Sequence, residues 1–213
     1  MTTLKTFLFD LDGTLVDSVA DLTTGINLLR GELNLESLPE ATVRGYVGDG
    51  ARLLVARALP EGAFSEERLA RFMTFYAAHL HDRTTVYPGI VQLLDRLRGF
   101  RLGVVTNKPE ELALRLLDAL GLAPYFGVVV GGDTLAEKKP AAAPVRFALE
   151  QLRSEPANAI LIGDHHTDLW AGKAAGVRTC FCAYGLGVTG DAPYDLRVES
   201  PAELQQLVPA EKP

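Results

Sequence analysis

The second half of the chain alternates between short apolar runs and segments with helical spacing. The runs "FRLGVVTN", "GVVVGGD", "AILIGD" and "RTCFCAYG" are almost continuously apolar, as expected for strands that are buried on both faces. The segments between them, "PEELALRLLDALGL", "APVRFALEQLRS" and "TDLWAGKAAG", repeat apolar residues at the helical period. This alternation predicts a doubly wound α/β domain with a parallel sheet, and the N-terminal "TFLFD" most simply joins that sheet.

The region between the first strand and residue 84 has a different pattern. No convincing strand occurs from about Asp17 to Arg83, but helical spacing recurs in "VADLTTGINLLRGEL", "ARLLVARAL" and "ERLARFMTFYAAHL". We therefore expect a Rossmann-like core of residues 1–16 and 84–213, interrupted by an all-helical insert of residues 17–83. The last residues, "PAEKP", are the only plausible tail.

Composition and charge narrow the classes of function. With 213 residues, 47% of them hydrophobic and a net charge of −6, the chain resembles an ordinary globular protein. The acidic balance argues against nucleic-acid and anionic-membrane binding. No apolar run approaches a membrane span, and the N-terminal "FLF" is too short for a signal peptide. We expect a cytoplasmic protein in which Cys180 and Cys182 are buried thiols on one face of a strand.

Polar residues follow the apolar strands at the points where the strands end. Asp10 and Asp12 follow the first strand, Thr106 and Asn107 follow a second, and Asp164 follows a third. Ligands of open α/β sheets bind at the carboxyl ends of the strands, so we expect these side chains to converge. Carboxylate oxygens suit Mg²⁺, and a cation would let a phosphate dianion approach an acidic site.

Four motifs in order give this pattern a family resemblance. "DLDGTLVDS", the strand-end "TN", the lysine in "KKP" and "GDHHTD" together resemble the haloacid dehalogenase superfamily, in its phosphatase branch. The resemblance spans essentially the whole chain and implies that the helical insert is a cap over the active site. The resemblance further implies that Asp10 is the nucleophile that forms an aspartyl-phosphate and that Asp12 is the general acid and base. Thr106 and Lys139 would bind the phosphoryl group, with Asn107 in support. Mg²⁺ would be held by Asp10, the Asp12 carbonyl and Asp164, and Asp168 would orient Lys139 or the metal shell.

Further motifs resemble the phosphoglycolate phosphatase subgroup. These are "YVGDG", "YPGI", "TNKP" and "GGDTLAEKKP", and they imply hydrolysis of 2-phosphoglycolate, a small phosphorylated metabolite. Its carboxylate needs a cationic partner, for which Lys108 and Arg52 are the candidates. The loop with Gly45, Gly48 and Gly50 leads into a helix and is either an anion-binding N-terminus or a plain turn.

Several alternatives stay open. A sugar-phosphate phosphatase or a β-phosphoglucomutase-like enzyme shares the motifs and the position of the cap. A signalling receiver domain has a different motif order and no helical insert, and a silent binding protein is disfavoured because every motif residue is present. The sequence departs from the family pattern at His165, where serine is usual, and at Ala142, where proline is common. It leaves open whether the protein is a monomer or a homodimer.

Overall fold

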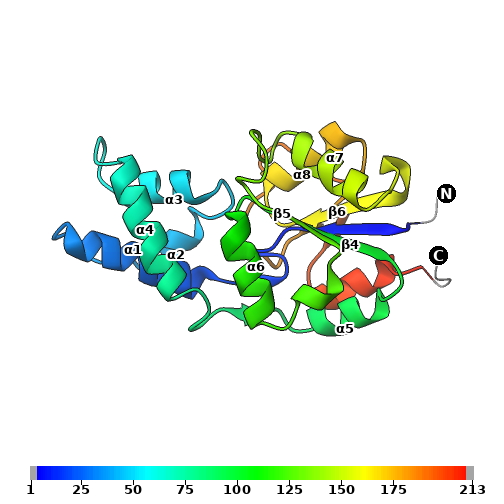
Figure 1. Cartoon of the computed structure of the whole chain (residues 1–213), viewed down its shortest axis with the longest axis horizontal. Coiled ribbons are helices and arrows are strands. Elements are labelled where there is room, and N and C mark those ends of the chain that lie inside the picture. Colours follow the sequence, from blue (N-terminus) through cyan, green and yellow to red (C-terminus); the bar gives the residue numbers. More distant parts are fainter. Residues whose placement is uncertain (1–3, 210–213) are drawn as a thin grey trace.

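Six parallel strands form the central sheet of the protein, in the order β5-β4-β1-β6-β7-β8 (Figure 1). A computed structural model describes residues 4–209, so the predicted tail lies, from residue 210 onward, outside the described residues. The strands are β1 (Thr6–Phe9), β4 (Arg101–Val105), β5 (Val128–Val130), β6 (Ala159–Gly163), β7 (Arg178–Cys182) and β8 (Leu196–Val198). The predicted doubly wound parallel sheet is confirmed, with β1 paired between β4 and β6.

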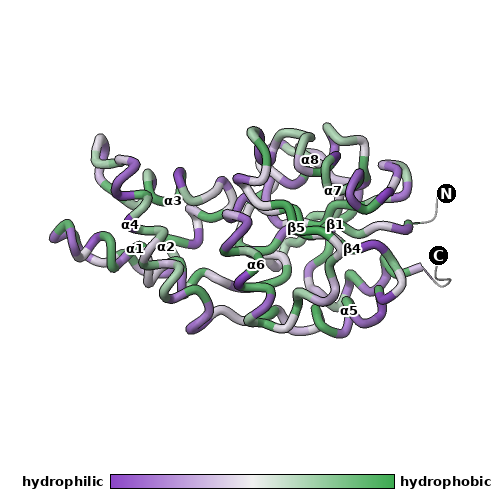
Figure 2. The backbone as a smooth tube through the Cα atoms, viewed as in Figure 1, coloured by the Kyte–Doolittle hydropathy of each residue, from purple (hydrophilic) through white to green (hydrophobic). Residues whose placement is uncertain are grey.

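Helices cover both faces of this sheet, because successive side chains of a strand point to opposite faces. Phe7 and Phe9 belong to the apolar cluster of α5 and α6, whereas Leu8 belongs to the cluster of α7 and α8. Figure 2 shows the hydrophobic residues concentrated along the central strands. The helices are α5 (Ile90–Arg96), α6 (Glu110–Ala119), α7 (Ala143–Gln151) and α8 (His166–Ala175), with the 3-10 turns η1 (Ala123–Tyr125), η2 (Pro156–Asn158) and η3 (Pro201–Leu207).

The helical insert packs as a separate group of helices beyond one end of the sheet (Figure 1). It contains α1 (Val19–Glu32), α2 (Glu40–Arg44), α3 (Ala51–Ala58) and α4 (Glu66–Ala78). Gly25 lets α1 approach α4 closely, since a Cβ at this position would lie 3.1 Å from the Phe72 ring. Phe72 and Ile26 are fully buried, so the insert has apolar packing of its own.

A short antiparallel ribbon joins the insert to the sheet. It consists of β2 (Val16–Asp17) and β3 (Thr85–Val86), in which Val16 pairs with Val86 and Asp17 with Thr85. The buried Asp21 carboxylate accepts hydrogen bonds from the backbone amides of Arg83 and Thr84, which ties the exit of the insert to its entry. The ribbon lies at the boundaries proposed from sequence, and the division into two domains stays a prediction.

Some features differ from the sequence expectation or extend it. The ribbon strands β2 and β3, the edge strand β8 and the helix α2 were not predicted from the sequence pattern. Cys180 and Cys182 are free and buried, as predicted. Among residues 4–209, no helix combines the length and the apolar character needed to cross a membrane.

Candidate active site

Three buried carboxylates meet at the carboxyl ends of the central strands. Asp10 follows β1 and Asp164 follows β6, while Asp168 lies in the first turn of α8. One oxygen from each lies within 4.8 Å of the others. The structure thus brings together groups that are more than 150 residues apart, because β1 and β6 are neighbours in the sheet.

Lys139 is the cation at the centre of this carboxylate cluster. Its Nζ lies 3.0 Å from Asp10 Oδ1 and 2.5 Å from Asp168 Oδ1, and it donates to the Val105 carbonyl at 2.6 Å. These contacts account for the three donors of an ammonium group. Burial alone would lower the pKa of Lys139, but Asp10 and Asp168 outweigh it and raise the pKa above its ordinary value.

The remaining negative charge of the cluster perturbs two of its carboxyl groups. Burial, then repulsion from Asp168, raises the pKa of Asp10 from 3.8 to about 6 despite the opposing effect of Lys139. Burial, then repulsion from Asp10, raises the pKa of Asp164 from 3.8 to about 8. Three buried carboxylates against one lysine are costly unless more positive charge is added. A donor set made only of carboxylate oxygens fits Mg²⁺.

The carboxylates of the cluster differ in their hydrogen-bond and ion-pair partners. Asp168 uses both oxygens within the protein, because Oδ1 contacts Lys139 and Oδ2 accepts from the His165 amide at 3.0 Å. Asp168 is therefore placed to orient Lys139. Within residues 4–209, the polar contacts of the Asp10 side chain go to Oδ1, which accepts from the Leu11 amide at 2.7 Å and faces Lys139.

Asp164 is held by the loop after β7. Its Oδ2 accepts from the Leu186 and Gly187 amides, each at 2.8 Å, and its Oδ1 accepts from the Thr14 hydroxyl at 3.1 Å. Gly13 permits this close approach, since its φ is +87° and a Cβ there would lie 2.2 Å from Asp164 Oδ2. The Asp-Gly step in the first motif is thus required by the neighbouring carboxylate as well as by the turn.

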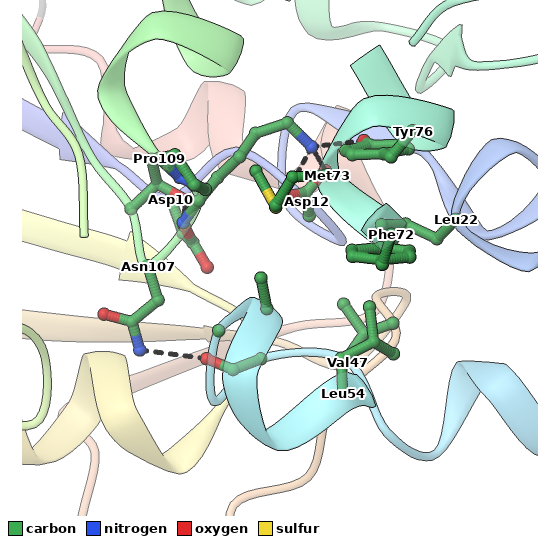
Figure 3. A pocket seen from close by; sticks show the side chains of 15 residues that line it. Asp10, Asp12, Leu22, Val47, Leu54, Phe72, Met73, Tyr76, Asn107 and Pro109 are labelled. Atoms are coloured by element: carbon green, nitrogen blue, oxygen red, sulfur yellow. Dashed lines mark hydrogen bonds and ion pairs between the residues drawn. The ribbon is translucent and has the colours of Figure 1, made fainter. Parts of the chain in front are cut away.

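Asp12 belongs to a second charged group beside the cluster (Figure 3). Lys108 Nζ lies 3.0 Å from Asp12 Oδ1 and 3.2 Å from Oδ2, and it also contacts the Tyr76 hydroxyl of α4. The Ser18 hydroxyl donates to Asp12 Oδ1 at 2.6 Å. Burial alone would lower the pKa of Lys108, but Asp12 and Tyr76 hold it above its usual range. Lys108 is therefore a buried cation, with a side chain only 3% exposed.

A pocket lies between the strand ends and the helical insert. Asp10, Asp12, Thr106, Asn107 and Lys108 line its core side. The insert contributes mainly apolar groups, as seen in Figure 3, and these are Leu22, Val47, Gly48, Gly50, Ala51, Leu54, Phe72, Met73 and Tyr76. Sequence reasoning did not select the apolar lining or Tyr76. The spacing of α4 signalled an amphipathic helix but did not show which face meets the site.

The glycine loop of the insert contacts the core through its backbone. Asn107 Nδ2 donates to the Gly48 carbonyl at 3.0 Å and to the Lys139 carbonyl at 3.1 Å. Both amide hydrogens of Asn107 are thus engaged by the protein. Gly48 and Gly50 line the pocket with φ angles of 117° and 93°, whereas Gly45 at the end of α2 has an ordinary helical conformation.

The two candidate cations for a substrate carboxylate lie in different surroundings. Lys108 lines the pocket, whereas Arg52 forms an ion pair with Glu66 at 2.5 Å, and its side chain is 55% exposed. The structure does not bring Arg52 to the pocket.

His165 is buried at the N-terminus of α8, where burial, then His166, lowers its pKa to about 4. His79 pairs with Asp82 on the surface of the insert.

Comparisons with known proteins agree with this geometry. Residues 7–182 match the family described as "Haloacid dehalogenase-like hydrolase". The chain is 41% identical to a phosphoglycolate phosphatase of Chromobacterium violaceum, covering 96% of both chains. It is 46% identical to a phosphoglycolate phosphatase of Rhodospirillum rubrum, over 85% of this chain and 80% of that one. A crystal structure described as a predicted phosphoglycolate phosphatase from Haemophilus somnus 129pt superposes with a TM-score of 0.88 at 28% identity, covering 98% of this chain and all of that one.

Proposed function

Since this chain belongs to the haloacid dehalogenase-like hydrolases, we propose that it is a Mg²⁺-dependent phosphomonoesterase that hydrolyses 2-phosphoglycolate to glycolate and phosphate. The observation that carries this proposal is that Asp10 of the carboxylate cluster and the buried cation Lys108 line the same pocket. A carboxylate cluster with Lys139 suits a phosphoryl group, and a buried Lys108 lies beside it to meet a second anion. The names of the relatives support the choice of substrate.

Asp10 is the nucleophile in this proposal. One of its oxygens attacks phosphorus, the bond between phosphorus and the ester oxygen breaks, and an aspartyl-phosphate forms. The contacts of Oδ1 with the Leu11 amide and Lys139 fix the carboxylate and leave Oδ2 to react. When bound by Asp10, the Asp12 carbonyl and Asp164, Mg²⁺ would offset the charge of the phosphoryl group and help to orient it.

Asp12 is the general acid and base. It gives a proton to the leaving alkoxide and then takes one from the water that hydrolyses the aspartyl-phosphate. Ser18 and Lys108 hold its carboxylate from two directions, which keeps it at a fixed position. Thr106 and Asp10 line the same pocket, and the Thr106 hydroxyl and Lys139 bind the phosphoryl oxygens during transfer.

Lys108 binds the carboxylate of the substrate. A buried ammonium attracts a second anion far more strongly than an exposed one, because bulk water does not screen it. The Lys108 ammonium contacts Asp12 and Tyr76, so a short substrate can place its phosphate at Asp10 and its carboxylate at Lys108.

We propose residues 1–16 and 84–213 as the core domain and residues 17–83 as the cap, which encloses the substrate and excludes water.

The lining of the pocket argues against the sugar-phosphate alternatives. The insert residues that line it are apolar apart from the Tyr76 hydroxyl and backbone groups. A sugar phosphate would bring several hydroxyl groups into this wall and leave them without partners, at a cost of about 1–3 kcal/mol for each unpaired group. A small substrate with two anionic ends avoids this cost.

Phosphate release from a panel of substrates tests the proposal. With Mg²⁺ present, we expect the highest kcat/KM for 2-phosphoglycolate, lower values for sugar phosphates, and almost no turnover in chelator. Lys108→Met should reduce kcat/KM for 2-phosphoglycolate by about 100-fold more than kcat/KM for ethyl phosphate, the loss of a buried charged contact, because the loss of the contact between Lys108 and Asp12 affects both substrates alike. A clear preference for sugar phosphates would refute the substrate, whereas full activity of Asp10→Asn would refute the mechanism.

A further inference from the structure

A second group of metal-binding side chains lies where the insert meets the core. Asp49 belongs to the insert loop before α3, whereas His165 and His166 begin α8 in the core. One potential ligand atom of each residue lies within 4.8 Å of the other two. His166 Nε2 is 3.7 Å from Asp49 Oδ1, and the two imidazole rings have centroids 4.0 Å apart. The proposed phosphatase mechanism uses none of these three side chains.

The backbone around His165 holds its ring in place. A Cβ at Gly48 would lie 2.6 Å from the imidazole, and a Cβ at Gly187 would lie 2.7 Å from it. The insert and the core therefore both press on this ring. His165 Nδ1 lies 3.1 Å from the Thr167 hydroxyl. In this structure Nδ1 also accepts from the Thr167 backbone amide at 3.4 Å. Metal binding at Nε2 requires the hydrogen to move to Nδ1, which then donates to the Thr167 hydroxyl, the arrangement that ligating histidines usually have.

The donor set differs in kind from the carboxylate cluster nearby. Two imidazole nitrogens and one carboxylate oxygen form a set typical of zinc, whereas Mg²⁺ prefers oxygen alone. Ligand atoms of a tetrahedral zinc ion lie about 3.4 Å apart, given bonds of about 2.0–2.1 Å. The separation of 3.7 Å between His166 and Asp49 is close to this value, and the partly exposed His166 can make the small adjustment.

Positive neighbours leave one oxygen of Asp49 available. Arg57 lies 2.6 Å from Asp49 Oδ2, which leaves Oδ1 on the side of His166. Lys138 donates to the Asp49 backbone carbonyl at 2.6 Å and not to the carboxylate.

We propose that Asp49, His165 and His166 bind one zinc ion, which bridges the insert loop and α8. The fourth ligand is water, because three protein ligands leave one position of a tetrahedral ion open. Since Asp49 comes from the insert and the histidines come from the core, the bound ion holds the loop of residues 45–50 against the core. Zinc is therefore expected to favour the closed arrangement of the pocket, and this consequence is independent of the substrate that the enzyme hydrolyses.

Equilibrium dialysis against zinc, in excess Mg²⁺, tests the site in the full-length chain. We expect one zinc ion per chain. His166→Gln and Asp49→Asn should each weaken binding by at least about tenfold, the lower end of the loss seen when even an outer partner of a metal site is removed. His81→Gln is the matched control, because His81 lies exposed on the insert, and it should bind zinc like the parent. Asp10→Asn should also bind like the parent, because it alters only the carboxylate cluster.

Two further readouts distinguish this site from zinc binding elsewhere on the protein. Co²⁺ in place of zinc should give the strong visible absorption of a tetrahedral site in the parent and in His81→Gln, and should lose it in His166→Gln. Zinc should slow hydrogen exchange in residues 45–50 of the parent but not of His166→Gln, because the bridge limits local opening. Zinc binding that survives in His166→Gln and disappears in Asp10→Asn would place the ion in the carboxylate cluster and overturn the proposal, as would the absence of zinc binding by the parent.

Discussion

Replacing Lys108 with methionine is the sharpest test of the charged group around Asp12. Lys108 Nζ lies 3.0 Å from Asp12 Oδ1, and the two side chains are 3% and 13% exposed. Methionine preserves most of the apolar stem but leaves the carboxylate without its cation. Removing one partner of a buried ion pair costs about 3–5 kcal/mol. Because Ser18 still donates to Asp12 and some water reaches it, we expect the lower end, about 3 kcal/mol.

Urea unfolding at neutral pH measures this loss directly. With an m value of about 3 kcal/mol per molar for a chain of this size, the midpoint should fall by about 1 M. Asp12→Asn should destabilise the protein less, and the double variant should lose clearly less than the sum of the two, because the penalty is the unpaired charge. Lys5→Met is the control, since Lys5 is exposed and a surface change stays within about 0.5 kcal/mol. An additive double variant, or a loss under about 1 kcal/mol for Lys108→Met, would refute the reasoning.

Three other changes probe the carboxylate cluster. Asp10→Asn should lower kcat for phosphate release by at least about 1000-fold, because the amide cannot attack phosphorus; circular dichroism checks that the fold persists. Gly13→Ala should destabilise the protein by about 2 kcal/mol in a thermal melt, since the φ of Gly13 is +87° and the new Cβ would meet Asp164. Gly31→Ala is the control and should not destabilise the protein in this way, because a Cβ at Gly31 meets nothing within 4 Å. Without metal, the folded-state pKa values of about 6 for Asp10 and about 8 for Asp164 exceed their ordinary value of 3.8. The folded state therefore binds more protons than the unfolded state between these pH values. The melting temperature should consequently fall as pH rises from about 4 to about 8. Mg²⁺ should reverse this trend and stabilise the protein most at the upper end, and a Mg²⁺ effect independent of pH would contradict the assignment.

The sheet and its helices could be predicted because their patterns are long enough to carry a period. The apolar runs of β1, β4, β6 and β7 and the helical spacing of α1, α4 and α6 all extend over at least four residues. The ribbon strands β2 and β3 have two residues each, which is too short for a period to be recognised. Strand β8 is largely exposed at the edge of the sheet, so its sequence lacks the apolar signal of the inner strands.

The carboxylate cluster could be predicted in part, since the rule that sites lie at strand ends selects Asp10, Thr106 and Asp164 from topology alone. The apolar pocket wall that the insert contributes could not be predicted from the sequence, because it depends on how the helices pack across the pocket. Lys108 and Arg52 illustrate the difference. Both looked like candidate cations, yet Lys108 follows a strand end and is drawn into the pocket by Asp12, whereas Arg52 on α3 meets Glu66 on α4 and stays on the surface.

The attachment of the insert to the core depends partly on residues that line the pocket. Its ribbon holds it through only two residue pairs, Val16 with Val86 and Asp17 with Thr85, which fixes the orientation of the insert weakly. Further contacts between the insert and the core lie at the pocket, where Tyr76 meets Lys108 and Gly48 meets Asn107. If residues 17–83 act as the proposed cap, a ligand that competes for the ammonium of Lys108 would also change how firmly the insert is held, and binding and closure would be coupled through the same side chain.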